Sequence, residues 1–177
     1  MKKLYRAIFA ALIIASLLSL VSYTAVAATA HQSDENERNH FRARLSGFQQ
    51  VPTLFSTGSG TFSATILNGG TTLSYTLTYT GLTGTMAAHI HLGLRGTNGG
   101  IIAFLCGGGG KPACPTSSGT VSGTITAADV IGPSAQGLSV GAFANFLTSL
   151  RAGATYVNVH TTAFPGGEIR GQLTPSG

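Results

Sequence analysis

The sequence predicts an all-β domain, a sandwich or flattened barrel with one or two short helices. From residue 40 onward, short runs alternate apolar and polar residues, which is the pattern of half-buried strands. These runs are rich in Thr and Tyr, which suit a pleated surface. Turns that contain Gly, Asn and Pro separate them, and the chain has 25 glycines. Together these features favour about eight strands.

The segment before residue 40 has the layout of a secretory signal peptide. Basic residues precede the apolar run 7–21, and small residues follow at 25–27 and again at 28–30. A retained membrane anchor is the alternative, but a spanning helix needs about 20 apolar residues. We therefore expect cleavage. The expected organisation is a signal peptide over 1–27, a polar segment over 28–39 and one domain over 40–177.

Each expected strand is justified by its own alternation and by the turn that ends it. Phe41, Ala43 and Leu45 alternate with polar residues, and a loop containing Pro52 follows them. The turn at 68–70 (NGG) joins two arms of a hairpin, because Asn-Gly tolerates positive φ. The expected strands are, in order, 41–46, the hairpin 59–82, 86–93, 101–105, 120–125, 154–161 and 168–173.

Two stretches between the last strands have helical features. Residues 126–129 form one helical turn, with Thr126 as N-cap and Asp129 at the third helical position. Residues 139–151 are expected to form a helix that begins at Ser139 and stops before Gly153. Its apolar positions fall on one helical stripe, which favours packing onto the core over a ligand groove. The stripe consists of Val140, Phe143, Phe146, Leu147 and Leu150.

Charge excludes one class of partner. Without the signal peptide, seven basic residues face five acidic ones, a net charge of about +2. The basic residues are scattered, whereas nucleic-acid binding needs a concentrated basic face. We expect no nucleic-acid partner, and no membrane span once the signal peptide is removed.

Cys106 and Cys114 flank a short Gly/Pro loop. In an exported protein a disulfide is the default state of such a pair, and it would stabilise the fold by about 2–3 kcal/mol. The alternative is a pair of thiolate metal ligands, but the spacing of the two cysteines differs from the usual Cys-x2–4-Cys spacing of zinc knuckles.

Two of the five histidines, His89 and His91, stand two residues apart in an expected strand, so both rings project from one face. His160 shares its strand face with Asn158. A site of His89, His91 and His160 would suit Zn²⁺ or Cu²⁺. Glu168 is a candidate fourth ligand, or a group that orients a ligand histidine, and Asn158 could serve the latter purpose.

A structural network is the competing interpretation. Buried imidazoles, Asn158 and an ion pair of Glu168 with Arg170 would specify one arrangement if every member is hydrogen-bonded. Dismutase-type redox catalysis is disfavoured, because it needs further ligands and the remaining histidines, His31 and His40, lie in the polar N-terminal region.

Other catalytic chemistry has little support. Asp129 and Glu168 are the only acids after residue 40, too few for a two-carboxylate hydrolase if Asp129 caps a helix. We therefore expect a binding or structural role, with transition-metal binding and redox activity at the histidines as the alternative.

Three segments resemble the signature blocks of the CHRD domain family, first described in chordin and also found in exported bacterial proteins. They are FRARLSGFQQVP, AAHIHLGLRGTNGGIIAFL and LRAGATYVNVHTTAFPGGEIRGQL. Gln49 and Gln50 stand where the family often carries a Glu before Val-Pro. The motif positions here are His89, His91, Asn98, Gly99, Asn158, His160, Gly166, Gly167, Glu168, Arg170 and Gly171.

The resemblance implies an immunoglobulin-like β-barrel with a faint likeness to copper/zinc superoxide dismutase. The family has no established enzymatic activity that the resemblance could transfer to this chain. With the expected signal peptide, we expect a secreted, periplasmic or cell-surface protein whose ligand is an extracellular protein, a polysaccharide or a metal.

Overall fold

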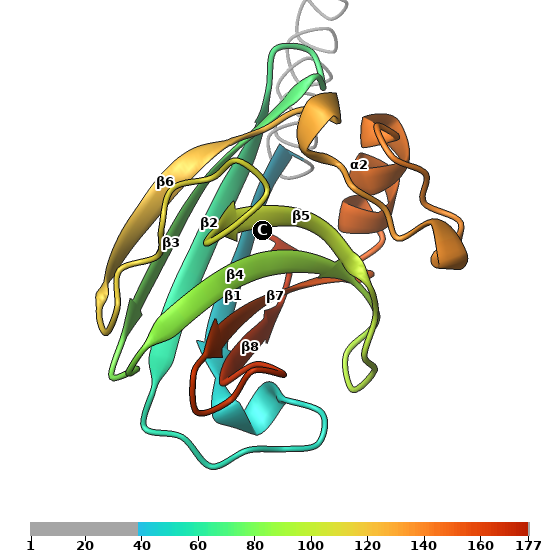
Figure 1. Cartoon of the computed structure of the whole chain (residues 1–177). Helices are drawn as coiled ribbons and strands as arrows, with labels where there is room; N and C mark the ends of the chain where they lie inside the picture. Colours follow the sequence, from blue (N-terminus) through green and yellow to red (C-terminus); the bar gives the residue numbers. More distant parts are fainter. Residues whose placement is uncertain (1–38, 177) are drawn as a thin grey trace, which may run out of the picture. The chain divides into compact units, whose positions relative to one another are not determined.

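A computed structural model describes residues 39–176, and the expected signal peptide and most of the polar segment lie outside this range. Nine strands of the described part form one antiparallel sheet in the order β5-β4-β7-β8-β1-β2-β3-β6, with β9 paired to β1 (Figure 1). The strands are β1 (His40–Ser46), β2 (Ser59–Leu67), β3 (Thr72–Thr80), β4 (Thr85–Leu92), β5 (Ile101–Cys106), β6 (Gly119–Ile125), β7 (Thr155–Thr161), β8 (Ile169–Gln172) and β9 (Thr174–Pro175).

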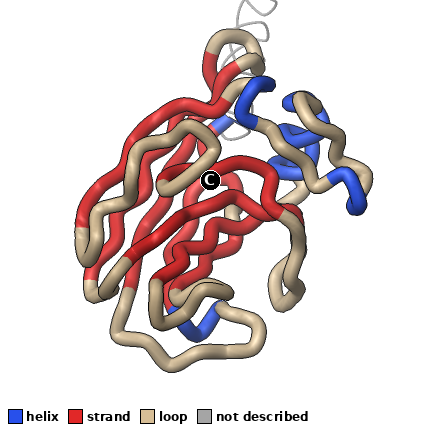
Figure 2. Tube along the Cα trace, in the orientation of Figure 1, coloured by secondary structure: helices blue, strands red, loops and turns tan. Residues whose placement is uncertain are grey.

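The sheet curls into a nearly closed, flattened barrel, which confirms the expected fold class (Figure 2). The gap between the outer strands β5 and β6 is bridged from both sides. The Tyr75 hydroxyl, on β3, donates to the Leu105 carbonyl of β5 at 2.7 Å. After β6, the backbone N–H of Ile131 donates to the Ile102 carbonyl at 2.9 Å. These bonds cover a strand edge that would otherwise be open to another chain.

Strand alternation places the core as the sequence predicts. In β1, Phe41, Ala43 and Leu45 are buried while Arg42 and Arg44 face outward. The β2–β3 hairpin turns at 68–70, where Asn68 has a φ of 53°. Both faces of β7 are buried, because loops cover the face that carries its polar residues. A polar row is therefore enclosed beside the apolar core.

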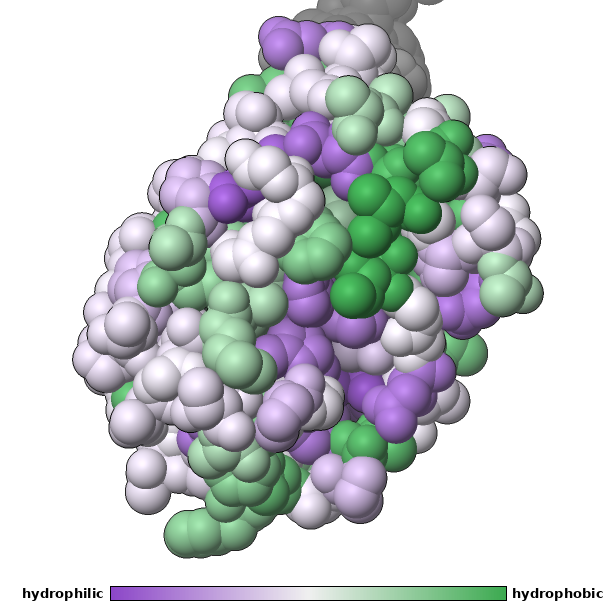
Figure 3. Space-filling model, in the orientation of Figure 1, coloured by the Kyte–Doolittle hydropathy of each residue, from purple (hydrophilic) through white to green (hydrophobic). Residues whose placement is uncertain are grey.

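The helical segments are η1 (Gly47–Gln49), η2 (Ala127–Asp129), η3 (Ser134–Gln136) and α2 (Phe143–Arg151). The last three gather at one end of the barrel (Figure 2). The capping box of Thr126 and Asp129 is present as expected. Figure 3 shows an apolar patch and a hydrophilic band side by side on one face of the molecule. No helix of residues 39–176 is long and apolar enough to cross a membrane.

The helix expected over 139–151 is shorter than predicted. It begins at Phe143 because Gly141 has a φ of 76° and its N–H is bonded to the Val130 carbonyl at 2.9 Å. Val140 is consequently outside the helix and 71% exposed, so its assignment to the apolar stripe was wrong. The other four stripe residues are buried, as expected for core packing. Gly153, with a φ of 66°, ends the helix as predicted.

The disulfide between Cys106 and Cys114 is present, with a Cα–Cα distance of 5.1 Å. It closes the loop that follows β5. A Cβ on Gly108 or Gly109 would lie 2.5 or 2.8 Å from the Phe104 ring. The two glycines therefore let the loop backbone rest directly on Phe104.

Candidate metal centre

Adjacent strands β4 and β7 bring three histidines together. The register pairs His89 with Asn158, and Ala87 with His160, so His89, His91 and His160 project from the same face. His89 Nδ1 lies 3.1 Å from His160 Nε2. One nitrogen of each ring lies within 4.8 Å of the other two. The structure thus brings together the three imidazoles that the sequence pattern singled out.

Backbone carbonyls fix the tautomer of two rings. His91 Nδ1 lies 2.9 Å from the Gly99 carbonyl, and His160 Nδ1 lies 2.9 Å from the Pro165 carbonyl. A carbonyl only accepts, so each Nδ1 carries the hydrogen and each Nε2 keeps a lone pair. This is the outer support that metal-ligating histidines commonly have.

Two ring nitrogens in the cluster lack a partner. His89 Nδ1–H donates to the lone pair of His160 Nε2, which leaves His89 Nε2 without its hydrogen. Nε2 of His89 and Nε2 of His91 are buried and have no hydrogen-bond partner among the described residues. An unsatisfied buried acceptor costs about 1–3 kcal/mol. The cluster is therefore incomplete as a hydrogen-bonded network.

Burial keeps the three rings neutral. It lowers the pKa of His89 to about 3, with further lowering from the positive charges that His160 and His91 would carry. Burial also lowers the pKa of His91 to about 4. The hydrogen bond to the Gly99 carbonyl raises this pKa, but by less than burial lowers it. The pKa of His160 is lowered for the same reason, against the bond to Pro165. Neutral imidazole is the form that binds metal.

An aromatic stack holds His91. Its ring lies parallel to that of Tyr156, with centroids 4.8 Å apart and an interplanar angle of 7°. The Arg170 guanidinium covers the opposite side, 3.4 Å from the Tyr156 centroid. Arg170 is buried and donates to the carbonyls of Leu94 and Thr97 at 3.2 and 2.7 Å. The stack fixes the position of the His91 ring.

His89 is held from the other side by Phe104, whose ring meets it at 87° with centroids 4.4 Å apart. Phe104 is the residue on which Gly108 and Gly109 rest. The disulfide loop and the histidine cluster are therefore in contact through one aromatic side chain.

Glu168 does not join the cluster. Its carboxylate accepts hydrogen bonds from Ser56 Oγ and Thr161 Oγ1, each at 2.7 Å. Among residues 39–176, only the three imidazoles make up the group that could hold an ion. The expected ion pair of Glu168 with Arg170 is also absent from the described residues: Arg170 is bonded to Leu94, Thr97 and Asn98 instead. Glu168 lies before β8, so strand alternation did not apply to it.

Asn158 supports the loops beside the cluster rather than the rings themselves. It accepts a hydrogen bond from Gln50 Nε2 at 2.7 Å and donates to the Gly166 carbonyl at 3.2 Å. Gln50 is the buried residue of the Gln-Gln pair that precedes Val-Pro. A Cβ on Gly167 would lie 2.3 Å from the Asn158 amide, so only glycine fits there.

The sequence could not reveal the carbonyls of Gly99 and Pro165 as partners, because a backbone acceptor has no residue-type signature. Tyr156 did have a signal, since it shares the β7 face with Asn158 and His160. Its stacking on His91 depends on the strand register, which sequence alone does not fix.

The geometry suits a small transition-metal ion. Two nitrogens bound at about 2.0–2.1 Å to one tetrahedral ion lie about 3.3 Å apart. One nitrogen of each of the three rings lies within 4.8 Å of the other two, so small side-chain movements would bring the set to this spacing. Three neutral imidazoles without a carboxylate are suited to Zn²⁺ or Cu²⁺ and leave one coordination position for an external ligand.

Comparison with known proteins gives one family. The model of the CHRD domain matches residues 41–173, which is more than half of the chain and includes all three histidines. Comparison with curated proteins finds no match.

Proposed function

The chain belongs to the CHRD domain family, and on that premise we propose that it is a non-enzymatic binding protein of the cell exterior whose histidine cluster holds Zn²⁺ or Cu²⁺. Membership of the family supports a general role for this domain. The histidine cluster supports the binding of a metal ion. The metal ligands would be His89, His91 and His160, with Arg170 and Asn158 as structural support.

The observation that carries this proposal is the pair of buried, unpartnered Nε2 atoms on His89 and His91. A purely structural network stabilises a fold only when its members are satisfied. Here the Nδ1–H groups of His91 and His160 are satisfied by carbonyls, while the lone pairs on Nε2 of His89 and His91 have no partner among the described residues. A bound cation would satisfy those lone pairs.

Two features support an exported protein. The N-terminal segment has the layout of a signal peptide. The disulfide between Cys106 and Cys114 is of a kind that persists in oxidising compartments. We accordingly place the protein in the periplasm, at the cell surface or outside the cell, with an extracellular protein or a polysaccharide as partner.

The test is metal content. The chain is purified without a histidine tag, loaded with Zn²⁺ or Cu²⁺, desalted and measured by elemental analysis. We expect about one equivalent of metal, lost on substitution of any of the three ligands. His91→Gln and His160→Gln are the test variants. His40→Gln is the matched control, because His40 is bonded to Thr65 outside the cluster.

Retention of less than about a tenth of an equivalent by the reconstituted wild type would refute the proposal. So would equal metal content in His40→Gln, His91→Gln and His160→Gln.

A further inference from the structure

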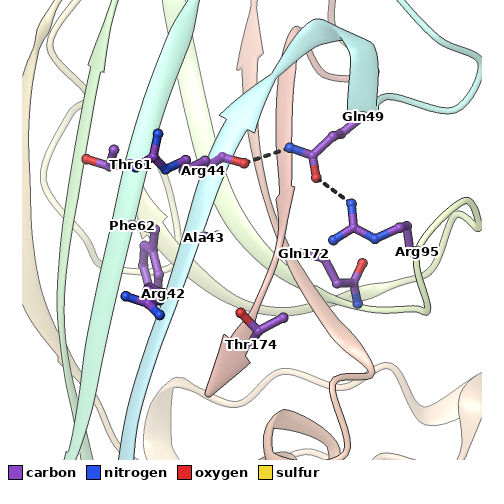
Figure 4. Close-up of a pocket in the computed structure, with 9 residues that line it drawn as sticks. All are labelled: Arg42, Ala43, Arg44, Gln49, Thr61, Phe62, Arg95, Gln172 and Thr174. Atoms are coloured by element: carbon purple, nitrogen blue, oxygen red, sulfur yellow. Dashed lines mark hydrogen bonds between the residues drawn. The ribbon is translucent and has the colours of Figure 1, made fainter. Parts of the chain in front are cut away.

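A groove on the outer face of β1 gathers three guanidinium groups. Arg42 and Arg44 come from β1, and Arg95 comes from the loop between β4 and β5. Its other polar lining residues are Gln49, Thr61, Gln172 and Thr174, and its volume is about 420 Å³ (Figure 4). The groove lies away from the histidines, which are not among its lining residues.

No acidic side chain of the described residues lines this groove. Asp129 is paired with Lys111 at 2.6 Å, and Glu168 is buried against hydroxyls. The positive charge of Arg95 also helps to lower the pKa of Arg170, after the larger effect of burial. Guanidinium groups that line one groove repel one another, and an anion bound there would relieve the repulsion.

Gln49 orients the Arg95 side chain in the groove. Gln49 Nε2 donates to the Arg44 carbonyl at 2.7 Å, and Arg95 Nη1 donates to Gln49 Oε1 at 3.0 Å (Figure 4). A guanidinium has five N–H donors in a planar fork that matches a carboxylate. The bond to Gln49 orients Arg95 while most of its donors stay available.

Gln172 adds an unsatisfied acceptor. Its side chain is only 8% exposed, and its Nε2 donates to the carbonyls of Gly93 and Gly153 at 2.9 and 2.8 Å. Its Oε1 has no hydrogen-bond partner among the described residues. The two carbonyls fix the orientation of the amide, so Gln172 is a rigid part of the groove wall, and its buried oxygen is not a direct contact for a ligand.

Aromatic side chains continue the surface. A second hollow of about 390 Å³ shares Gln49, Arg95 and Gln172 with the groove and includes Phe48 in its lining. Phe48 and Phe55 are 65% and 79% exposed, with ring centroids 6.1 Å apart. Exposed aromatic pairs of this kind mark binding surfaces more often than ordinary surface.

We propose that this surface binds an acidic polysaccharide whose sugar units carry carboxylates. The carboxylates would pair with Arg44 and Arg95. The exposed faces of Phe48 and Phe55 would pack against sugar rings. Three arginines are few for a nucleic-acid face, which argues against a phosphodiester backbone as the ligand.

The test is isothermal titration of the full chain with an oligogalacturonate of six units in low salt. Maltohexaose serves as the neutral probe and a single-stranded oligonucleotide as the phosphate probe. We expect binding of the oligogalacturonate only. Arg44→Gln and Arg95→Gln should each weaken it about tenfold or more, because each removes a charge-assisted contact.

Arg151→Gln is the matched control, since Arg151 is exposed, lies at the end of α2 and does not line the groove. It should change the affinity by less than about twofold. Circular dichroism confirms that each variant folds. Equal affinity in Arg44→Gln, Arg95→Gln and Arg151→Gln would overturn the proposal. Equal binding of maltohexaose or of the oligonucleotide would also overturn it.

Discussion

Acidification should destabilise the metal-free protein through the buried histidines. In the folded chain burial lowers the pKa of His89 to about 3 and that of His91 to about 4, so both stay neutral at pH 5. In the unfolded chain their pKa is about 6.5, and they take up protons below that value. Protons therefore favour the unfolded state, and stability is lost as the pH falls below about 6.5.

The size of the loss in the free energy of unfolding follows from the interval between pH 6.5 and pH 5. Each pH unit in this window costs about 1.4 kcal/mol for each such group, or about 2 kcal/mol for each histidine at pH 5. Both side chains are only 7% exposed, so solvent screens the effect little. We expect His89 and His91 together to cost about 3–4 kcal/mol, and His160, whose pKa is also lowered, adds in the same direction.

The assay is urea unfolding at pH 7 and pH 5 in the presence of a chelator. The chain has no tryptophan, so far-ultraviolet circular dichroism is the signal. His91→Gln should reduce the loss between the two pH values by about 1.5–2 kcal/mol. His40→Gln should leave it unchanged, because His40 lies outside the cluster.

Unchanged stability of the wild type between pH 7 and pH 5 would refute the reasoning. An undiminished loss in His91→Gln would show that other groups cause the acid sensitivity. Asp129 does not complicate this window: burial raises its pKa, but bonds to Lys111 and Thr126 outweigh that effect and lower it.

Two further predictions concern the core and the disulfide loop. Leu147→Ala should lower the free energy of unfolding by about 2–5 kcal/mol, whereas Val140→Ala, at a 71% exposed position, should change it by less than about 0.5 kcal/mol. Equal effects in urea unfolding would mean that α2 does not pack on the core. Replacing Cys106 and Cys114 together by alanine should cost about 2–3 kcal/mol and weaken metal binding measured by titration. Unchanged metal affinity in that variant would contradict the proposed contact between the loop and the centre.

The histidine cluster could be predicted because strand alternation fixes which side chains share a face. That rule alone predicts that His89 and His91 share a face. The prediction that His160 joins them also required its strand to lie beside theirs with the same face turned toward the cluster. Glu168 was misjudged because it precedes β8, and its partners Ser56 and Thr161 depend on how two loops fold. Contacts set by loops and strand register leave no periodic trace in a sequence.

The first residue of α2 could likewise not be predicted from the sequence. Ser139 is a plausible N-cap by residue type, and Val140 has the right spacing for the stripe. A backbone bond from Gly141 to Val130, across a turn, prevents helix formation there. Propensity identified the element, but tertiary contact set its first residue.

The pairing of the first strand of the domain with its last two has a consequence for how the chain matures. Phe41 is matched with Pro175, and Ser46 with Arg170, so β1 has one open edge until the final residues of the domain have emerged. Such distant pairing makes folding slow, because a long loop must close before the contact forms. If the protein is exported as proposed, the edge of β1 cannot be paired before the carboxyl-terminal strands have crossed the membrane.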